Sequence, residues 1–165
     1  MRRMLLALAG FLVVAALAVP AALADSPHFL FANSSVSSTT GALTVDFKEV
    51  GLGTGTTSVT ITLTVDSATA VYQCFNNGGN HPKAGNKETV NTTLQASGTF
   101  PVRNGQTTAS LSVGPPDQGD FACPSGQSLF LQSVTYSGIT VCDAAGNCLG
   151  ATPDPISSGP VHIPI

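Results

Sequence analysis

Apolar and polar residues alternate along most of the chain, and this period of two predicts strands. The clearest run is 59–65, where valine, isoleucine and leucine alternate with threonine. The same alternation occurs at 43–48, 90–96 and 109–113. Such a pattern is typical of strands with one face in the core and the other in water. No stretch of the chain after residue 25 has the period of an amphipathic helix.

The alternation changes phase after Asp66. Ala68, Ala70, Tyr72 and Cys74 then share a face. An extra residue in one strand of a pair, or a bend, causes such a shift, so we predict a β-bulge or bend near 66–67. We also expect this strand to cross from one sheet to another there, with Tyr72 and Cys74 facing the core.

Turn signals divide the remaining sequence into strands. Asn104-Gly105 predicts a tight hairpin, and 114–119 with its two adjacent prolines predicts a loop. We expect a strand at 28–31 and a long strand at 128–142 interrupted at Ser137-Gly138. We expect 151–160 to be a surface crossing and 161–165 to be an edge strand. The pattern predicts an all-β fold, an antiparallel immunoglobulin-like β-sandwich of about seven or eight strands, with a closed barrel as the alternative.

The first 24 residues have the features of a secretory signal peptide. Arg2 and Arg3 precede an apolar run, and Ala22-Leu23-Ala24 forms a small-residue cleavage site. The run is shorter than the roughly 20 residues of a spanning helix. We therefore expect a signal peptide at 1–24, one domain at 25–165, secretion, and no membrane span in the mature chain.

Charged residues make up only 9 % of the chain, and this limits the classes of partner. Removing Arg2 and Arg3 would lower the formal charge from −3 to −5. The basic residues that remain are Lys48, Lys83, Lys87 and Arg103, which are scattered. Nucleic acids and anionic membranes need a basic surface. We expect neither as a partner and favour an extracellular ligand or protein of unknown identity.

The chain has four cysteines, Cys74, Cys123, Cys142 and Cys148. An even number of cysteines in an exported chain favours disulfides. Cys142 and Cys148 flank a short turn that would bring their Cα atoms together, so we predict the pairs Cys142–Cys148 and Cys74–Cys123. Zinc sites usually have more closely spaced cysteine pairs, and we predict no metal site.

The loop from Asn76 to Lys87 is the most distinctive polar segment. It is rich in asparagine and glycine and contains two of the basic residues. Long loops on a rigid sandwich commonly carry function. We predict a ligand-binding loop, with the candidate residues Asn77, Asn80, His81, Lys83 and Lys87.

Catalytic signatures are missing from the sequence. No nucleophile elbow occurs, and no pair of carboxylates stands out. Most aspartates, Asp143 among them, fall in turns, where aspartate caps its own backbone. The absence of tryptophan argues against an aromatic sugar-binding platform. We therefore predict no catalytic residues, no cofactor and no enzymatic activity.

Two short motifs resemble known families. Asp66-Ser-Ala-Thr-Ala-Val-Tyr-Gln-Cys74 resembles the immunoglobulin strand with a conserved Tyr-x-Cys, although two extra residues separate Ala68 from Tyr72. Cys142-Asp-Ala-Ala-Gly-Asn147 resembles a fragment of the neocarzinostatin-type apoproteins, small exported sandwiches that carry a chromophore. The segment 72–86 is similar to uncharacterised small secreted actinobacterial proteins.

These features lead to one functional hypothesis and two alternatives. We expect a secreted, non-catalytic binding or structural module that acts through its loops. The resemblance to neocarzinostatin-type proteins implies a small-ligand carrier as one alternative. A secreted hydrolase with a cryptic site is the other.

Overall fold

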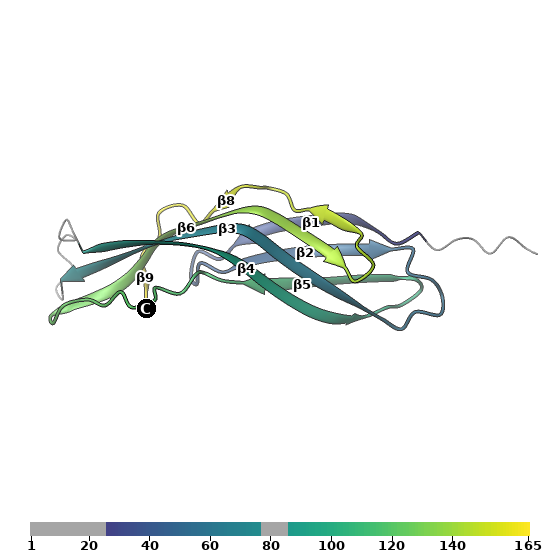
Figure 1. Ribbon diagram of the computed structural model, residues 1–165, viewed down its shortest axis with the longest axis horizontal. Helices are drawn as coiled ribbons and strands as arrows, with labels where there is room; N and C mark the ends of the chain where they lie inside the picture. Colours follow the sequence, from purple (N-terminus) through teal and green to yellow (C-terminus); the bar gives the residue numbers. More distant parts are fainter. Residues whose placement is uncertain (1–25, 77–85) are drawn as a thin grey trace, which may run out of the picture.

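The computed structural model describes residues 26–76 and 86–165, and these residues form two antiparallel sheets (Figure 1). The smaller sheet has three strands in the order β1-β2-β5. Its strands are β1 (His28–Val36), β2 (Leu43–Val50) and β5 (Gln106–Val113). The described residues contain no helix, so the all-β prediction is confirmed. In particular, residues 26–76 and 86–165 include no helix long and apolar enough for a membrane span.

The larger sheet has six strands and is built on three long ones. Its order is β4-β3-β6-β7, with β4 (Lys87–Pro101), β3 (Ser58–Asn76), β6 (Gln127–Asp143) and β7 (Cys148–Gly150). Two very short strands, β8 (Ile156–Ser157) and β9 (Ile163–Pro164), pair further along β6.

The core lies between the two sheets and is made by the alternating residues of their inner faces. Fully buried positions come from β2 on one side and from β3 and β6 on the other, and β5 adds the largely buried Leu111. The largest buried apolar and aromatic side chains are Leu43, Val45, Phe47, Ile61, Leu63, Leu131, Ile139, Tyr72 and Tyr136. The two tyrosines therefore face the core, as their strand phase predicts.

The predicted bulge is present, but the strand does not change sheets. The register of β3 against β4 shifts between Val65 and Ala68. Both halves of β3 pair with β4 and β6, so the predicted crossing is wrong. The expected interruption at Ser137-Gly138 is also wrong, because β6 is continuous there. Gly138 has φ +66° and lies against the bulge, where a Cβ would be only 2.4 Å from Asp66 Oδ2. The glycine makes room for the extra residue opposite it instead of ending the strand.

The long strands extend past the three-stranded sheet at one end of the molecule, where β3 ends and β4 begins, on the left in Figure 1. We call this extension the arm. The segment between β5 and β6 lies against its inner face. The Tyr72 hydroxyl donates to the Pro116 carbonyl, and Cys74 is bonded to Cys123. These two contacts fix a segment without regular structure over the part of β3 that the small sheet does not reach.

Both predicted disulfides are confirmed. Cys74–Cys123 joins residues 49 apart in sequence, with a Cα–Cα distance of 5.6 Å. Cys142–Cys148 closes the β6–β7 hairpin, with a Cα–Cα distance of 4.1 Å. No cysteine is free. Two disulfides are consistent with an oxidising, extracellular location.

The C-terminal segment runs along the outer edge of β6. β7, β8 and β9 each pair with successive parts of that strand, so the predicted C-terminal edge strand is present. Thr152 also forms backbone hydrogen bonds with Ala32 and Ser34 of β1. The segment therefore joins the two sheets along one side.

Candidate functional site

Most of the predicted binding-loop residues fall outside the described structure. Asn77, Asn80, His81 and Lys83 are not among the described residues. Lys87 is described; it is the first residue of β4, and its side chain is exposed. The binding loop therefore stays a prediction.

An aromatic cluster lies on the arm, close to where that loop begins. Phe75 meets Phe130 edge to face, with ring centroids 5.2 Å apart. The His162 ring stacks on Phe130 at 3.9 Å and contacts Phe75 at 4.4 Å. Gln132 lies 3.2 Å from His162 Nδ1, within hydrogen-bond distance. These contacts attach the C-terminal segment to the arm.

The outer face of the six-stranded sheet carries hydroxyl and amide side chains over much of its area. Strand alternation places them there, because their neighbours in sequence face the core. We call this surface the hydroxyl face, and its residues are Thr60, Thr62, Thr64, Ser67, Thr69, Asn91, Thr93, Gln95, Ser97, Thr99, Ser133, Thr135, Ser137 and Thr140. Within the spans 60–69, 91–99 and 133–140 one residue is charged, Asp66 at the bulge.

Hydrogen bonds across the strands order the hydroxyl face. The Thr60 and Thr99 hydroxyls are 2.9 Å apart, and those of Thr62 and Ser97 are 3.2 Å apart. The Asn91 amide donates to Ser67 and Thr69. Each hydroxyl retains further capacity to donate or accept. The surface is therefore both ordered and able to bond a polar neutral ligand.

The outer face of the three-stranded sheet differs in charge. Asp46 and Lys48 project from β2. The neighbouring positions on β5 are Thr108 and Ser110. The two outer surfaces therefore offer different chemistry to a ligand.

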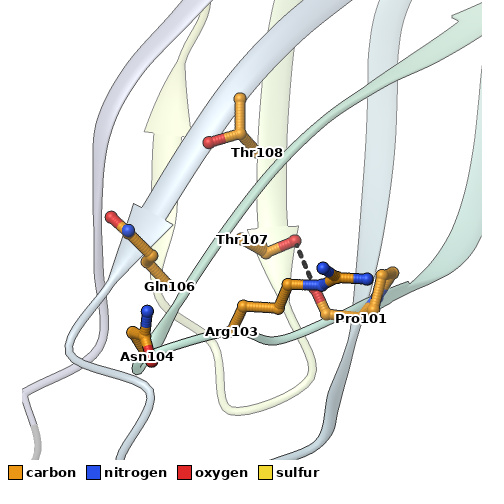
Figure 2. Close-up of a pocket in the computed structure, with 6 residues that line it drawn as sticks. All are labelled: Pro101, Arg103, Asn104, Gln106, Thr107 and Thr108. Carbon is orange, nitrogen blue, oxygen red and sulfur yellow. Dashed lines mark hydrogen bonds between the residues drawn. The ribbon is translucent and has the colours of Figure 1, made fainter.

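An open pocket of about 270 Å³ lies beside the turn that joins β4 to β5 (Figure 2). It is lined by Pro101, Arg103, Asn104, Gln106, Thr107 and Thr108. Asn104 and Gly105 both have positive φ, and Arg103 and Gln106 form an isolated antiparallel bridge, so the predicted tight turn is present. The predicted hairpin is wrong beyond this turn, because β4 and β5 belong to different sheets and do not pair. The Thr107 hydroxyl donates to the Pro101 carbonyl, as the dashed line in Figure 2 shows. Arg103 is the cation among the pocket's lining residues.

Two carboxyl groups meet inside the sandwich at the same end of the molecule. Glu49 of β2 is 0 % exposed, and neither of its oxygens has a hydrogen-bond donor. Asp143, the last residue of β6, is 8 % exposed. Asp143 accepts hydrogen bonds from the Asn147 backbone and side chain, both at 2.7 Å. Its turn-capping role is therefore confirmed.

The environment separates the pKa values of the two carboxyls. Burial, a hydrogen bond to Asp143 and the charge of Asp143 raise the pKa of Glu49 to about 7. Burial alone would raise the pKa of Asp143, but the hydrogen bonds from Asn147, Glu49 and Ala145 outweigh it and lower that pKa. Glu49 therefore takes up a proton before Asp143 does.

Sequence reasoning did not find this pair, although a signal for it exists. The alternation Leu43, Val45, Phe47 continues to Glu49, and Ile139, Val141 continues to Asp143. Extending each run by one step places a carboxyl on the buried face. The described residues contain no group of three or more histidine, cysteine or acidic side chains that could hold a metal ion.

Comparisons with known proteins give no relative for this chain. No family model, curated protein or solved structure matches it.

Proposed function

We propose that the protein is an exported, non-catalytic binding or structural module with an immunoglobulin-like sandwich. In this proposal residues 1–24 are a cleaved signal peptide and 25–165 the working domain. The module acts through its hydroxyl face on a neutral, polyhydroxylated polymer such as an extracellular polysaccharide.

The composition of the hydroxyl face carries this proposal. A neutral glycan presents hydroxyl donors and acceptors without charge, and the hydroxyl face presents the same groups. Its cross-strand hydrogen bonds hold side chains such as Thr62 and Ser97 in place before a ligand arrives. Such preorganisation lowers the entropic cost of binding.

Recognition on this surface would depend on hydrogen bonds rather than on stacking. Both tyrosines are buried, and the chain has no tryptophan. Each hydrogen bond contributes little net free energy, because it replaces hydrogen bonds to water. Several contacts along a polymer are therefore needed for useful affinity. Because the surface carries almost no charge, we expect binding that is insensitive to salt.

Retention on insoluble neutral polysaccharides tests the proposal. Protein from the culture medium should begin at Asp25 by mass and should be retained on at least one neutral glycan at low and high salt. Replacing Ser97 and Thr135 by lysine on the hydroxyl face should weaken retention about tenfold or more. The matched control is the double variant Ser110→Lys and Ser112→Lys, which places the same two charges on the outer face of the small sheet.

Two results would contradict the proposal. One is no retention on any neutral glycan. The other is equal loss of retention in the hydroxyl-face double variant and in the Ser110→Lys, Ser112→Lys control. Protein in the medium that still begins at Met1 would contradict the cleavage of residues 1–24.

A further inference from the structure

Glu49 is the most anomalous group in the described structure. It lies on the core side of β2, is fully buried, and has no donor for either oxygen. Its cross-strand neighbours are Phe29 on β1 and Thr107 on β5. Phe29 has no polar side-chain atom, and the Thr107 hydroxyl already donates to Pro101. A buried carboxyl without a donor is costly when ionised, so it requires an explanation.

The partner of Glu49 comes from the opposite sheet. Asp143 ends β6, next to the Cys142–Cys148 disulfide, and two hydrogen bonds from Asn147 hold its carboxylate in place. Two ionised carboxylates cannot bond each other, because neither has a hydrogen to donate. When Glu49 is protonated, its hydroxyl can donate to Asp143. One proton therefore completes a contact between β2 and β6.

The cross-strand neighbours of Glu49 in the small sheet do not supply that proton. The elements packed around it contribute Phe29 from β1, Thr107 from β5 and, beside Asp143, Ile61 from β3. None of these side chains titrates. The charge that acts on Glu49 is that of Asp143.

We propose that Glu49 and Asp143 form a proton-operated latch between the two sheets. With the proton bound, the pair closes this end of the sandwich. Without it, two buried negative charges face each other across the interface between the sheets and force this end open. The latch requires no part of the proposed polysaccharide-binding function.

The pKa values set the direction of the switch. The pKa of Glu49 is raised from 4.5 to about 7, so the folded protein binds this proton more tightly than the unfolded chain. The stability that this bound proton provides is fully present below pH 4.5 and is lost as the pH rises to about 7. The lowered pKa of Asp143 has the opposite effect, which is confined to more acidic pH.

Opening at this end would reach the surface through Thr107. This residue pairs with Glu49 in the small sheet and lines the pocket that contains Arg103. Figure 2 shows the Thr107 hydroxyl directed at the Pro101 carbonyl. A change in the latch therefore has a direct route to the pocket.

Chemical denaturation between pH 5 and pH 8 tests the latch. In the purified protein with both disulfides formed, the unfolding equilibrium constant should rise by roughly a hundredfold over this range. Glu49→Gln keeps the shape and an N–H donor but cannot ionise, so its stability should be nearly constant. The matched control is Glu88→Gln, because Glu88 is the chain's other glutamate and is exposed on β4. It should keep the pH dependence of the unchanged protein.

Two further measurements make the test independent of how well a variant folds. An infrared carbonyl band of a protonated carboxyl should persist in the unchanged protein at pH 6 and disappear by pH 8. Amide exchange, corrected for its intrinsic pH dependence, should accelerate at β7 and the turn between β4 and β5 at pH 8 and not on the arm. The proposal would be overturned if the stability of the unchanged protein did not vary between pH 5 and pH 8, or if the stability of Glu49→Gln varied as much as that of the unchanged protein. Faster amide exchange at pH 8 on the arm alone would also overturn it. Restoration of stability at pH 8 by calcium that depends on Glu49 would also overturn it, because the pair would then be a metal site.

Discussion

The two ends of the core both bury polar side chains, but they satisfy them differently. Toward the arm, the Tyr136 hydroxyl donates to the Gly41 carbonyl at 2.7 Å, and Tyr72 donates to Pro116. At the other end, Glu49 depends on a proton shared with Asp143. The comparison shows that burial alone does not decide the effect of a polar group; the availability of a donor at a given pH does.

Because of this difference, the two ends lose stability at different pH. Ionised Glu49 costs about 3 kcal/mol of stability above pH 7, since its pKa moves from 4.5 to about 7. Burial also raises the pKa of both tyrosines, with a further contribution from Asp117 at Tyr72. Their contribution is lost only as the pH rises past the ordinary tyrosine pKa of about 10. We therefore expect the Glu49 end to weaken near neutral pH and the tyrosine end to weaken only in strong alkali.

The disulfides offer the largest contrast between the ends. Removing Cys74–Cys123 by a double alanine substitution should lower the free energy of unfolding by about 4 kcal/mol, because it closes the longer loop. Removing Cys142–Cys148 in the same way should cost about 2 kcal/mol. Urea denaturation at pH 6 measures both losses. Equal losses would show that loop length does not govern the difference.

Tyr136→Phe tests the end toward the arm, where the buried hydroxyls have hydrogen-bond partners. The change keeps the ring but removes the buried donor to Gly41, so we expect a loss of about 2 kcal/mol at both pH 5 and pH 8. Thermal and urea denaturation at the two pH values measure it. A loss that appears at only one pH would mean that the two ends are not independent, and the contrast between them would fail.

Asn147→Ala tests the hydrogen bond that holds Asp143 in the carboxyl pair. It should have the smallest effect, a loss of about 1 kcal/mol in the free energy of unfolding at pH 6. The variant loses the amide bond to Asp143 and keeps the backbone one. The pKa of Asp143 should therefore rise, and the loss of stability on acidification should begin at a higher pH. Denaturation between pH 2 and pH 5 detects this shift. If stability between pH 2 and pH 5 varied as in the unchanged protein, the backbone hydrogen bond alone would hold Asp143.

Local signals in the sequence predicted the strands, the bulge and both disulfides. The phase change at Asp66 located the bulge because a period of two leaves no other way to keep Val65 and Ala68 on one face. The Asn104-Gly105 turn was predictable because few residues accept positive φ. These features depend on residues close together in the chain.

Features that depend on distant residues were not predicted. We expected β3 to change sheets at Asp66, but Gly138 on β6 accommodates the bulge in place. The meeting of Glu49 and Asp143 likewise depends on how the sheets align, which alternation in one strand does not specify. The hydroxyl face was visible only as separate threonine-rich strands until pairing placed them side by side.

The C-terminal segment gives the two sides of the sandwich different capacities for assembly. It occupies the outer edge of β6 and bonds to β1 at Thr152, whereas β4 and β5 end their sheets on the opposite side. Strand addition to the six-stranded sheet is thus directed to the β4 edge. Two molecules joined there would present their C-terminal segments outward, so growth would stop at a pair instead of propagating as a fibre.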